Sequence, residues 1–140
     1  MAQDEPLNLS TGSLNPDQLN LIFQHLPLEI TFVDEHDVIR YYSDVPNPIF
    51  PRTPERIGMS VLDCHPPETQ AGVRRLLQEL RSGGCRQATA VKVVNGRMIY
   101  IKYLSFWDVE GNYRGVLETA QDVTDFSDLR GEGKVYSGVG

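Results

Sequence analysis

The chain has 140 residues, with 19 acidic and 13 basic side chains and a net charge of −6, and this length suits one domain with its own core. The acidic balance argues against nucleic-acid binding, and no apolar run approaches the roughly 20 residues of a membrane span. The N-terminus has no basic region followed by an apolar stretch, so the expected location is the cytoplasm.

Residues 1–13 are polar and are expected to be flexible. A helix start follows, because Asn15 can cap, Pro16 suits the first helical position and Gln18 can close a capping box. The helix should end before Pro27. Its apolar stripe consists of Leu19, Ile22, Phe23 and Leu26. Such a helix must lie on a sheet or on a partner.

Two strands are predicted next, over residues 28–34 and 38–42. The proline-rich stretch 43–58 excludes long regular structure and leaves room for short helices. Pro66-Pro67-Glu68 opens the longest helix, which Gly83-Gly84 ends. One face of this helix is apolar and carries Val73, Leu76, Leu77 and Leu80.

Residues 86–94, 97–107 and 112–123 read as three consecutive antiparallel strands. Asn95-Gly96 is the strongest turn signal, because a type I′ turn needs positive φ at both central residues. The predicted fold class is α+β, a five-stranded antiparallel sheet with short helices and one longer helix on one face, plus the N-terminal amphipathic helix. The expected domain spans residues 14–130, and 131–140 is a flexible tail.

Pairing across Asn95-Gly96 sets the register of the central hairpin, with Val94 opposite Arg97 and Lys92 opposite Ile99. Both faces are apolar, so periodicity alone does not say which one is inner. One face carries Ala88, Ala90, Lys92, Ile99, Ile101, Tyr103, Ser105 and Trp107. The other carries Val91, Val93, Met98, Tyr100, Leu104 and Phe106.

The order of elements and several motifs resemble a PAS domain over residues 14–129. Phe32-Val33-Asp34 is similar to the end of the first PAS strand, and Ile57-Gly58 to the pair before the long helix. Asp122-Val123-Thr124 resembles the closing motif of the family. Two further segments, 49–53 and 64–67, resemble a PAS subgroup found at the end of larger chains that carry a hemerythrin-like domain; the sequence has no cluster of His and acidic ligands for such a domain.

The resemblance implies a sensory module that binds a small ligand or cofactor in its core and signals through dimerisation or a partner protein. It implies that the face with Ile99 and Ile101 lines the pocket. The alternative is a ligand-free interaction module whose pocket is filled by its own side chains. The implied binding residues are His65, Ala88, Ala90, Lys92, Ile99, Ile101, Tyr103, Val116, Glu118 and Ala120.

His65 precedes the long helix and is the candidate axial ligand of a haem iron, with a helix-capping or carbonyl-bonded His as the alternative. Haem is therefore the first candidate cofactor, and flavin is less favoured because Asp63-Cys64-His65 lacks the Asn-Cys-Arg context of light-sensing relatives. Cys64 and Cys85 have no metal or redox spacing and are expected to be thiols. Glu118 and Lys92 either form a polar anchor in the pocket or lie in water at the sheet edge.

The outer face would form a large exposed apolar patch on a monomer, so the sequence predicts a homodimer. The expected dimer face consists of Leu19, Ile22, Phe23, Leu26, Val91, Val93, Met98 and Tyr100. By resemblance, Asp122 and Thr124 couple the last strand to an unidentified output protein. No arrangement of nucleophile and base supports catalysis, so an enzyme is not expected.

Overall fold

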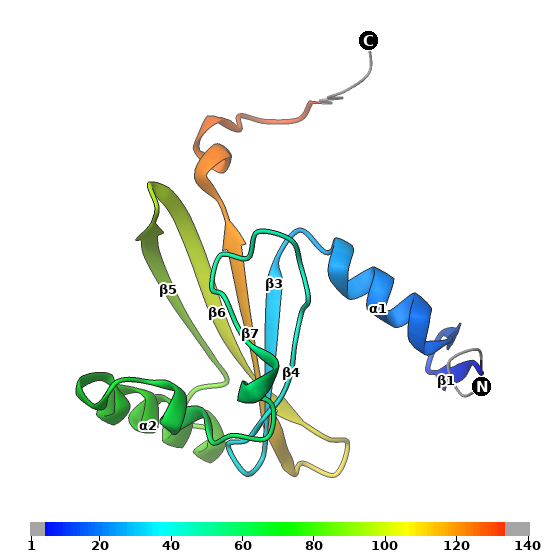
Figure 1. The fold of residues 1–140 in the computed structure, drawn as a ribbon, viewed down its shortest axis with the longest axis vertical. Helices are drawn as coiled ribbons and strands as arrows, with labels where there is room; N and C mark the ends of the chain where they lie inside the picture. Colours follow the sequence, from blue (N-terminus) through cyan, green and yellow to red (C-terminus); the bar gives the residue numbers. More distant parts are fainter. Residues whose placement is uncertain (1–4, 134–140) are drawn as a thin grey trace.

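A computed structural model describes residues 5–133 of the chain. It contains α1 (Pro16–His25), α2 (Pro67–Ser82) and a five-stranded antiparallel sheet in the order β4-β3-β7-β6-β5 (Figure 1). The strands are β3 (Glu29–Asp34), β4 (Ile39–Tyr42), β5 (Gln87–Val94), β6 (Arg97–Trp107) and β7 (Tyr113–Asp122). Short 3₁₀ helices cover Pro54–Arg56, Val61–Cys64 and Thr124–Asp128. The predicted α+β fold with its five-stranded sheet is confirmed.

The N-terminal segment differs from the prediction, because residues expected to be flexible form a hairpin. Strand β1 (Leu7–Leu9) pairs with β2 (Gly12–Leu14) across a turn at Ser10 and Thr11, and Gly12 begins β2 with a φ of +137°. Each strand of this hairpin is too short to show a recognisable alternation of apolar and polar residues. Both leucines of β1 are exposed. The predicted tail 131–140 lies mostly outside the described residues.

The register of the central hairpin is the one that Asn95-Gly96 predicts. Val94 pairs with Arg97, and the ladder continues without a shift to Gln87 and Leu104. Asn95 and Gly96 both have positive φ, at 50° and 77°, as a type I′ turn requires. This pairing fixes which side chains share a face of the sheet.

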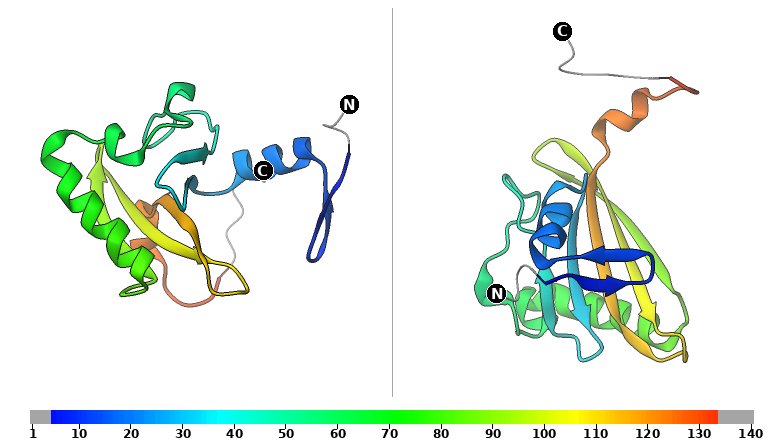
Figure 2. Two further views of the ribbon diagram at one scale, coloured as in Figure 1. Left: turned by 90° about the horizontal axis from the view of Figure 1, so that it is seen from below. Right: turned by 90° about the vertical axis from the view of Figure 1, so that its right-hand side faces the viewer.

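The inner face of the sheet is covered by α2 and the segment that precedes it (Figures 1 and 2). Leu77 and Leu80 of α2 are buried against Val116 of β7. A second cluster forms further along the sheet, where Ile99, Ile101 and Ala120 are buried under Ile49 and Phe50. The side with Ile99 and Ile101 is thus the inner side.

Within residues 5–133, no segment covers the outer face as α2 covers the inner one. Helix α1 begins with the predicted capping box, in which Asn15 and Gln18 bond each other's backbone N–H groups. Figures 1 and 2 show α1 and the β1–β2 hairpin extending outward from the sheet. No residue of α1 is buried. Phe23 of α1 contacts Tyr41 of β4, with the two ring centroids 5.4 Å apart. Of the apolar stripe, Ile22 is exposed, and Leu19, Phe23 and Leu26 are partly buried.

Candidate functional site

A cavity of about 280 Å³ lies between the inner face of the sheet and α2. Its sheet wall comes from all five strands, and its other walls come from α2 and the segment 50–65. The lining residues are Thr31, Val33, Ile39, Phe50, Pro51, Arg52, Arg56, Val61, Cys64, His65, Val73, Leu76, Leu77, Leu80, Lys92, Ile101, Tyr103, Val116 and Glu118. The cavity thus has an apolar wall on α2 and polar groups on the sheet and the segment.

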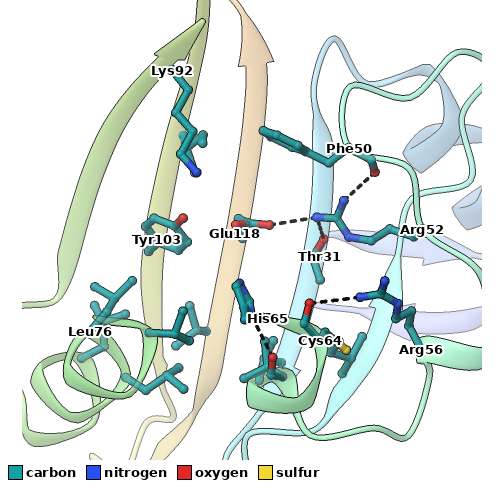
Figure 3. A pocket seen from close by; sticks show the side chains of 18 of the residues that line it. Thr31, Phe50, Arg52, Arg56, Cys64, His65, Leu76, Lys92, Tyr103 and Glu118 are labelled. Atoms are coloured by element: carbon teal, nitrogen blue, oxygen red, sulfur yellow. Dashed lines mark hydrogen bonds and ion pairs between the residues drawn. The ribbon is translucent and has the colours of Figure 1, made fainter. Parts of the chain in front are cut away.

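An ion pair crosses this cavity from the proline-rich segment to the sheet. The Arg52 guanidinium donates to Glu118 Oε1 at 3.1 Å and to Thr31 Oγ1 at 3.2 Å (Figure 3). Its other terminal nitrogen donates to the Phe50 carbonyl. Both side chains of the pair are about three-quarters buried, at 22% and 25% exposure. Glu118 therefore pairs with Arg52, and Lys92 is not its partner.

Tyr103 stands beside Glu118, its direct partner across β6 and β7. Burial, and then the charge and hydrogen bonding of the Glu118 carboxylate, raise the pKa of Tyr103 to about 12. The phenol is therefore neutral across the physiological range. Tyr103 therefore adds no charge to the cavity, and its hydroxyl is hydrogen-bonded to the Glu118 carboxylate.

The segment that carries Arg52 is anchored by a carboxylate on β3. Glu29 accepts hydrogen bonds from the backbone N–H groups of Ile49 and Phe50, the latter at 3.2 Å. These bonds satisfy two donors in a stretch without regular structure. They hold Ile49 and Phe50 down on the sheet and place Arg52 at the cavity.

His65 lies at the end of the 3₁₀ helix Val61–Cys64, with its Nδ1 2.9 Å from the Val61 carbonyl. Because a carbonyl only accepts, Nδ1 carries the proton and the neutral ring has its lone pair on Nε2. That nitrogen suits a haem iron as a donor. The space does not suit the macrocycle, because the cavity is small and the Arg52–Glu118 pair crosses it. The residues present therefore do not fit haem.

Two cations at the cavity have no acidic partner within the described part of the chain. Lys92 and Arg56 form no ion pair there, although Arg56 bonds the Cys64 carbonyl at 3.4 Å. Lys92 is exposed at the rim, and Figure 3 shows its side chain directed into the cavity. Cys64 and Cys85 are free thiols, and Cys64 lines the cavity.

Some of the residues expected to bind a ligand lie on the inner face without lining the cavity. His65, Lys92, Ile101, Tyr103, Val116 and Glu118 line it; Ala88, Ala90, Ile99 and Ala120 do not. Ile49 and Phe50 pack over the Ala120 end of the sheet and occupy the room that small side chains leave there. Sequence reasoning missed this because the Glu29 anchor that places them spans 20 residues.

Several lining residues were not among the expected binding residues. The sequence predicted that Leu76, Leu77 and Leu80 lie on the apolar face of α2. Because this face packs toward the sheet, it could have identified these leucines as lining residues of the cavity. Arg52 carried no comparable signal, because its partner Glu118 is 66 positions away in the sequence.

The residues expected at the dimer face lie on the outer side of the sheet and on α1. Val91, Val93 and Met98 are exposed, Val93 at 73%. Tyr100 is partly buried, and the Lys102 ammonium lies 6.0 Å from its ring centre. On α1, Ile22 is exposed, whereas Leu19, Phe23 and Leu26 are partly buried.

The end of β7 is tied to the start of β6 by a knot of hydrogen bonds. Asp122 accepts from the Thr124 hydroxyl at 2.6 Å, from the Thr124 N–H at 3.0 Å and from Arg97 at 2.7 Å. The Thr124 hydroxyl oxygen in turn accepts from the Met98 N–H at 2.9 Å. The hydrogen bonds from Thr124 and Arg97 lower the pKa of Asp122 to about 2. The knot fixes where the chain leaves the sheet.

Residues 5–133 contain no group of three or more His, Cys, Asp or Glu side chains arranged to hold a metal ion. Within the same residues, the helices are too short or too polar to cross a membrane.

The chain is similar to a known domain family and to solved structures. The PAS domain family model matches residues 19–124. A C-terminal domain from Streptococcus mutans is 36% identical, with a TM-score of 0.85, and the match covers 91% of this chain and 99% of that one. No curated protein matches.

Two more distant structures share the fold. A PAS domain from Colwellia psychrerythraea has a TM-score of 0.57 at 15% identity, covering 78% of this chain and 97% of that one. A sensory box sensor histidine kinase from Vibrio cholerae has a TM-score of 0.54 at 13% identity, covering 76% and 89%.

Proposed function

The chain belongs to the PAS domain family, a sensory or interaction fold, and from that premise we propose that it is a non-catalytic sensor. It takes a compact ligand into the cavity between the sheet and α2 and reports binding through a homodimer. The observation that carries this proposal is the division of the sheet into two faces. One face bounds a partly polar cavity, and the other presents an exposed apolar patch.

The cavity supports a small ligand. Its volume of about 280 Å³ is near the lower end of the roughly 300–1,000 Å³ that ligand pockets occupy. A few polar groups converge on an otherwise apolar wall, as is typical of small-molecule sites. A macrocyclic cofactor would need the Arg52–Glu118 pair to open.

A thermal-stability screen tests ligand binding. Compact neutral, anionic and cationic compounds, flavin mononucleotide and haem are each added to the purified protein. Any compact ligand at 100 times its Kd stabilises the fold by about 2.7 kcal/mol, which raises Tm by several degrees. The proposal fails if no compact compound raises Tm. A Soret band abolished by His65→Ala would instead restore haem as the ligand.

The outer patch supports the homodimer. We define the outer patch as Val91, Val93, Met98 and Tyr100 on the outer face of β5 and β6. Three of these four side chains are exposed, and Phe106 on the same face is exposed as well. A contiguous apolar surface of this kind marks interaction sites. Helix α1 of a second copy is the proposed cover, and Leu21 and Ile22 supply exposed apolar surface on that helix.

Sedimentation equilibrium tests the dimer with two matched variants. Val93→Glu places a charge in the outer patch and is expected to give a folded monomer. Val109→Glu makes the same change at a fully exposed turn and is expected to leave the dimer intact. A wild-type protein that stays monomeric at high micromolar concentration would contradict the proposal.

The signal is transmitted to an output protein through the hydrogen-bonded residues Asp122 and Thr124.

The segments 49–53 and 64–67 support a place in the subgroup that accompanies hemerythrin-like domains. The similarity to a C-terminal domain from Streptococcus mutans is compatible with this, because that module ends a longer chain. Two free thiols support a reducing compartment such as the cytoplasm.

A further inference from the structure

The charge of the cavity is opposite to the charge of the protein. The chain carries a net charge of −6. The cavity lining contains three cationic side chains, Arg52, Arg56 and Lys92, and one acidic side chain, Glu118. The lining therefore carries more positive than negative charge, opposite in sign to the chain as a whole.

The single acid of the lining does not balance the three cations. Glu118 is held by Arg52, which also donates to the Thr31 hydroxyl and the Phe50 carbonyl. This pair is neutral in sum. Lys92 and Arg56 remain, and neither forms an ion pair with a described carboxylate. The charge left over in the lining is positive.

The lining is also divided along its length. Leu76, Leu77 and Leu80 of α2 form an apolar wall, whereas Lys92 and Tyr103 stand on the sheet (Figure 3). A ligand that fills this space has an apolar body and one polar end. Its size follows from the volume, roughly 10 to 15 non-hydrogen atoms at the packing density of protein interiors.

We propose that the cavity binds a compact amphipathic monoanion, with its carboxylate at Lys92 beside the Tyr103 hydroxyl and its apolar body against the leucines of α2. This inference rests on the proposed ligand-binding function and names the chemical class of the ligand.

The donors at the polar end suit a carboxylate. Lys92 is at the rim, so its ammonium keeps part of its hydration and the ion pair forms without full desolvation of either charge. The raised pKa of Tyr103 keeps its hydroxyl protonated, so this residue adds no negative charge at the polar end of the cavity. A cationic ligand would meet two uncompensated positive side chains and only a paired acid.

The experiment compares compounds that share one skeleton and differ in charge. 3-Phenylpropionate, 3-phenylpropanamide and 3-phenylpropylamine are titrated into the full chain by calorimetry and by two-dimensional amide NMR. The carboxylate is expected to bind at least tenfold more tightly than the amide, and the amine is expected not to bind. Addition of the carboxylate is expected to change the amide chemical shifts of cavity residues on β6, β7 and α2.

Matched variants locate the carboxylate. Lys92→Met is expected to reduce carboxylate affinity about tenfold and to leave amide affinity unchanged. Lys102→Met removes the same charge from the opposite face of the same sheet and is expected to change neither affinity. Arg56→Gln is expected to have a smaller effect than Lys92→Met.

The outcomes separate this inference from the proposed function. If the amide binds as tightly as the carboxylate, the cavity is a ligand site but the preference for anions is wrong. If Arg56→Gln, and not Lys92→Met, removes the preference, the placement of the carboxylate is wrong. If no compound of the three shifts a cavity amide, the inference fails for this size class, and the broader screen of compact compounds still decides the proposed function.

Discussion

Arg52 donates to Glu118 at 3.1 Å across the cavity and so connects the proline-rich segment to the middle strand of the sheet. The same guanidinium bonds Thr31 on β3. The pair thereby neutralises Glu118, the one acidic side chain among the described lining residues. Any ligand that enters must either leave this pair in place or compete with it.

Replacing Arg52 by Gln is expected to destabilise the fold by about 1–2 kcal/mol, because Glu118 is then left without its charged partner in a partly buried site. Urea unfolding of the single and double variants with Glu118→Gln measures the coupling between the two residues. Arg114→Gln breaks the more exposed pair with Glu35 and is the control, with an expected loss below about 0.5 kcal/mol. Equal losses in the two Arg variants would contradict a structural role for the cavity pair.

Gly115 on β7 is expected to tolerate no side chain. A Cβ there would lie 2.2 Å from the Val33 carbonyl oxygen, and φ is +131°. Gly115→Ala should therefore disrupt the pairing of β3 with β7 and cost about 3 kcal/mol or more. Gly72→Ala on α2 meets nothing within 4 Å and should stabilise the helix by about 0.5–1 kcal/mol. Thermal unfolding of both variants measures the contrast, and a Gly115→Ala protein of wild-type Tm would contradict it.

The knot at Asp122 is expected to make stability depend on acid. Its folded pKa of about 2 lies below the usual 3.8, because Thr124 and Arg97 hydrogen-bond the carboxylate. The stabilisation is thus complete above about pH 4 and is lost as pH falls toward 2. Urea unfolding of wild type and Asp122→Asn from pH 7 to pH 2 tests this. The free energies of unfolding of the two proteins should become equal near pH 2. A difference that stays constant from pH 7 to pH 2 would refute the contribution of the knot.

Tyr103 is expected to be the last tyrosine to ionise. Burial and the Glu118 carboxylate hold its pKa at about 12 in the fold, above the usual value of 10. Its neutral form therefore stabilises the fold below about pH 10, and that contribution is lost as pH rises toward 12. Absorbance titration of phenolate in wild type and Tyr103→Phe is the measurement. The titration curve of Tyr103→Phe should lack the ionisation that occurs at the highest pH in the wild type. A curve that is identical to the wild type at alkaline pH would contradict the buried position of Tyr103.

The register of the sheet could be predicted from sequence because it depends on local chemistry. Asn95-Gly96 has one favoured turn, and that turn fixes every pair from Val94 to Gln87. The inner and outer faces could not be separated in this way, because both are apolar. Family resemblance distinguished them, and the burial of Ile99 and Ile101 agrees with it.

The cavity itself depends on contacts that have no local signature. Glu29 bonds the backbone at Ile49 and Phe50, 20 residues later, and Arg52 reaches a strand that is 66 residues later. No periodicity or turn motif encodes such pairs. The packing of Ile49 and Phe50 over the Ala120 end of the inner face has no local signature either. The open cavity lies instead beside Leu76 and His65.

The central claim is that occupancy of the cavity is read by the dimer. Sedimentation equilibrium measures it directly, as the dimer dissociation constant with and without a saturating amount of the tightest-binding probe. Because linkage is reciprocal, a sensor must show a shift, and the expected change is at least fivefold. The variant Val93→Glu should remain monomeric in both conditions. A probe that binds in the cavity and leaves the dissociation constant unchanged would contradict the account.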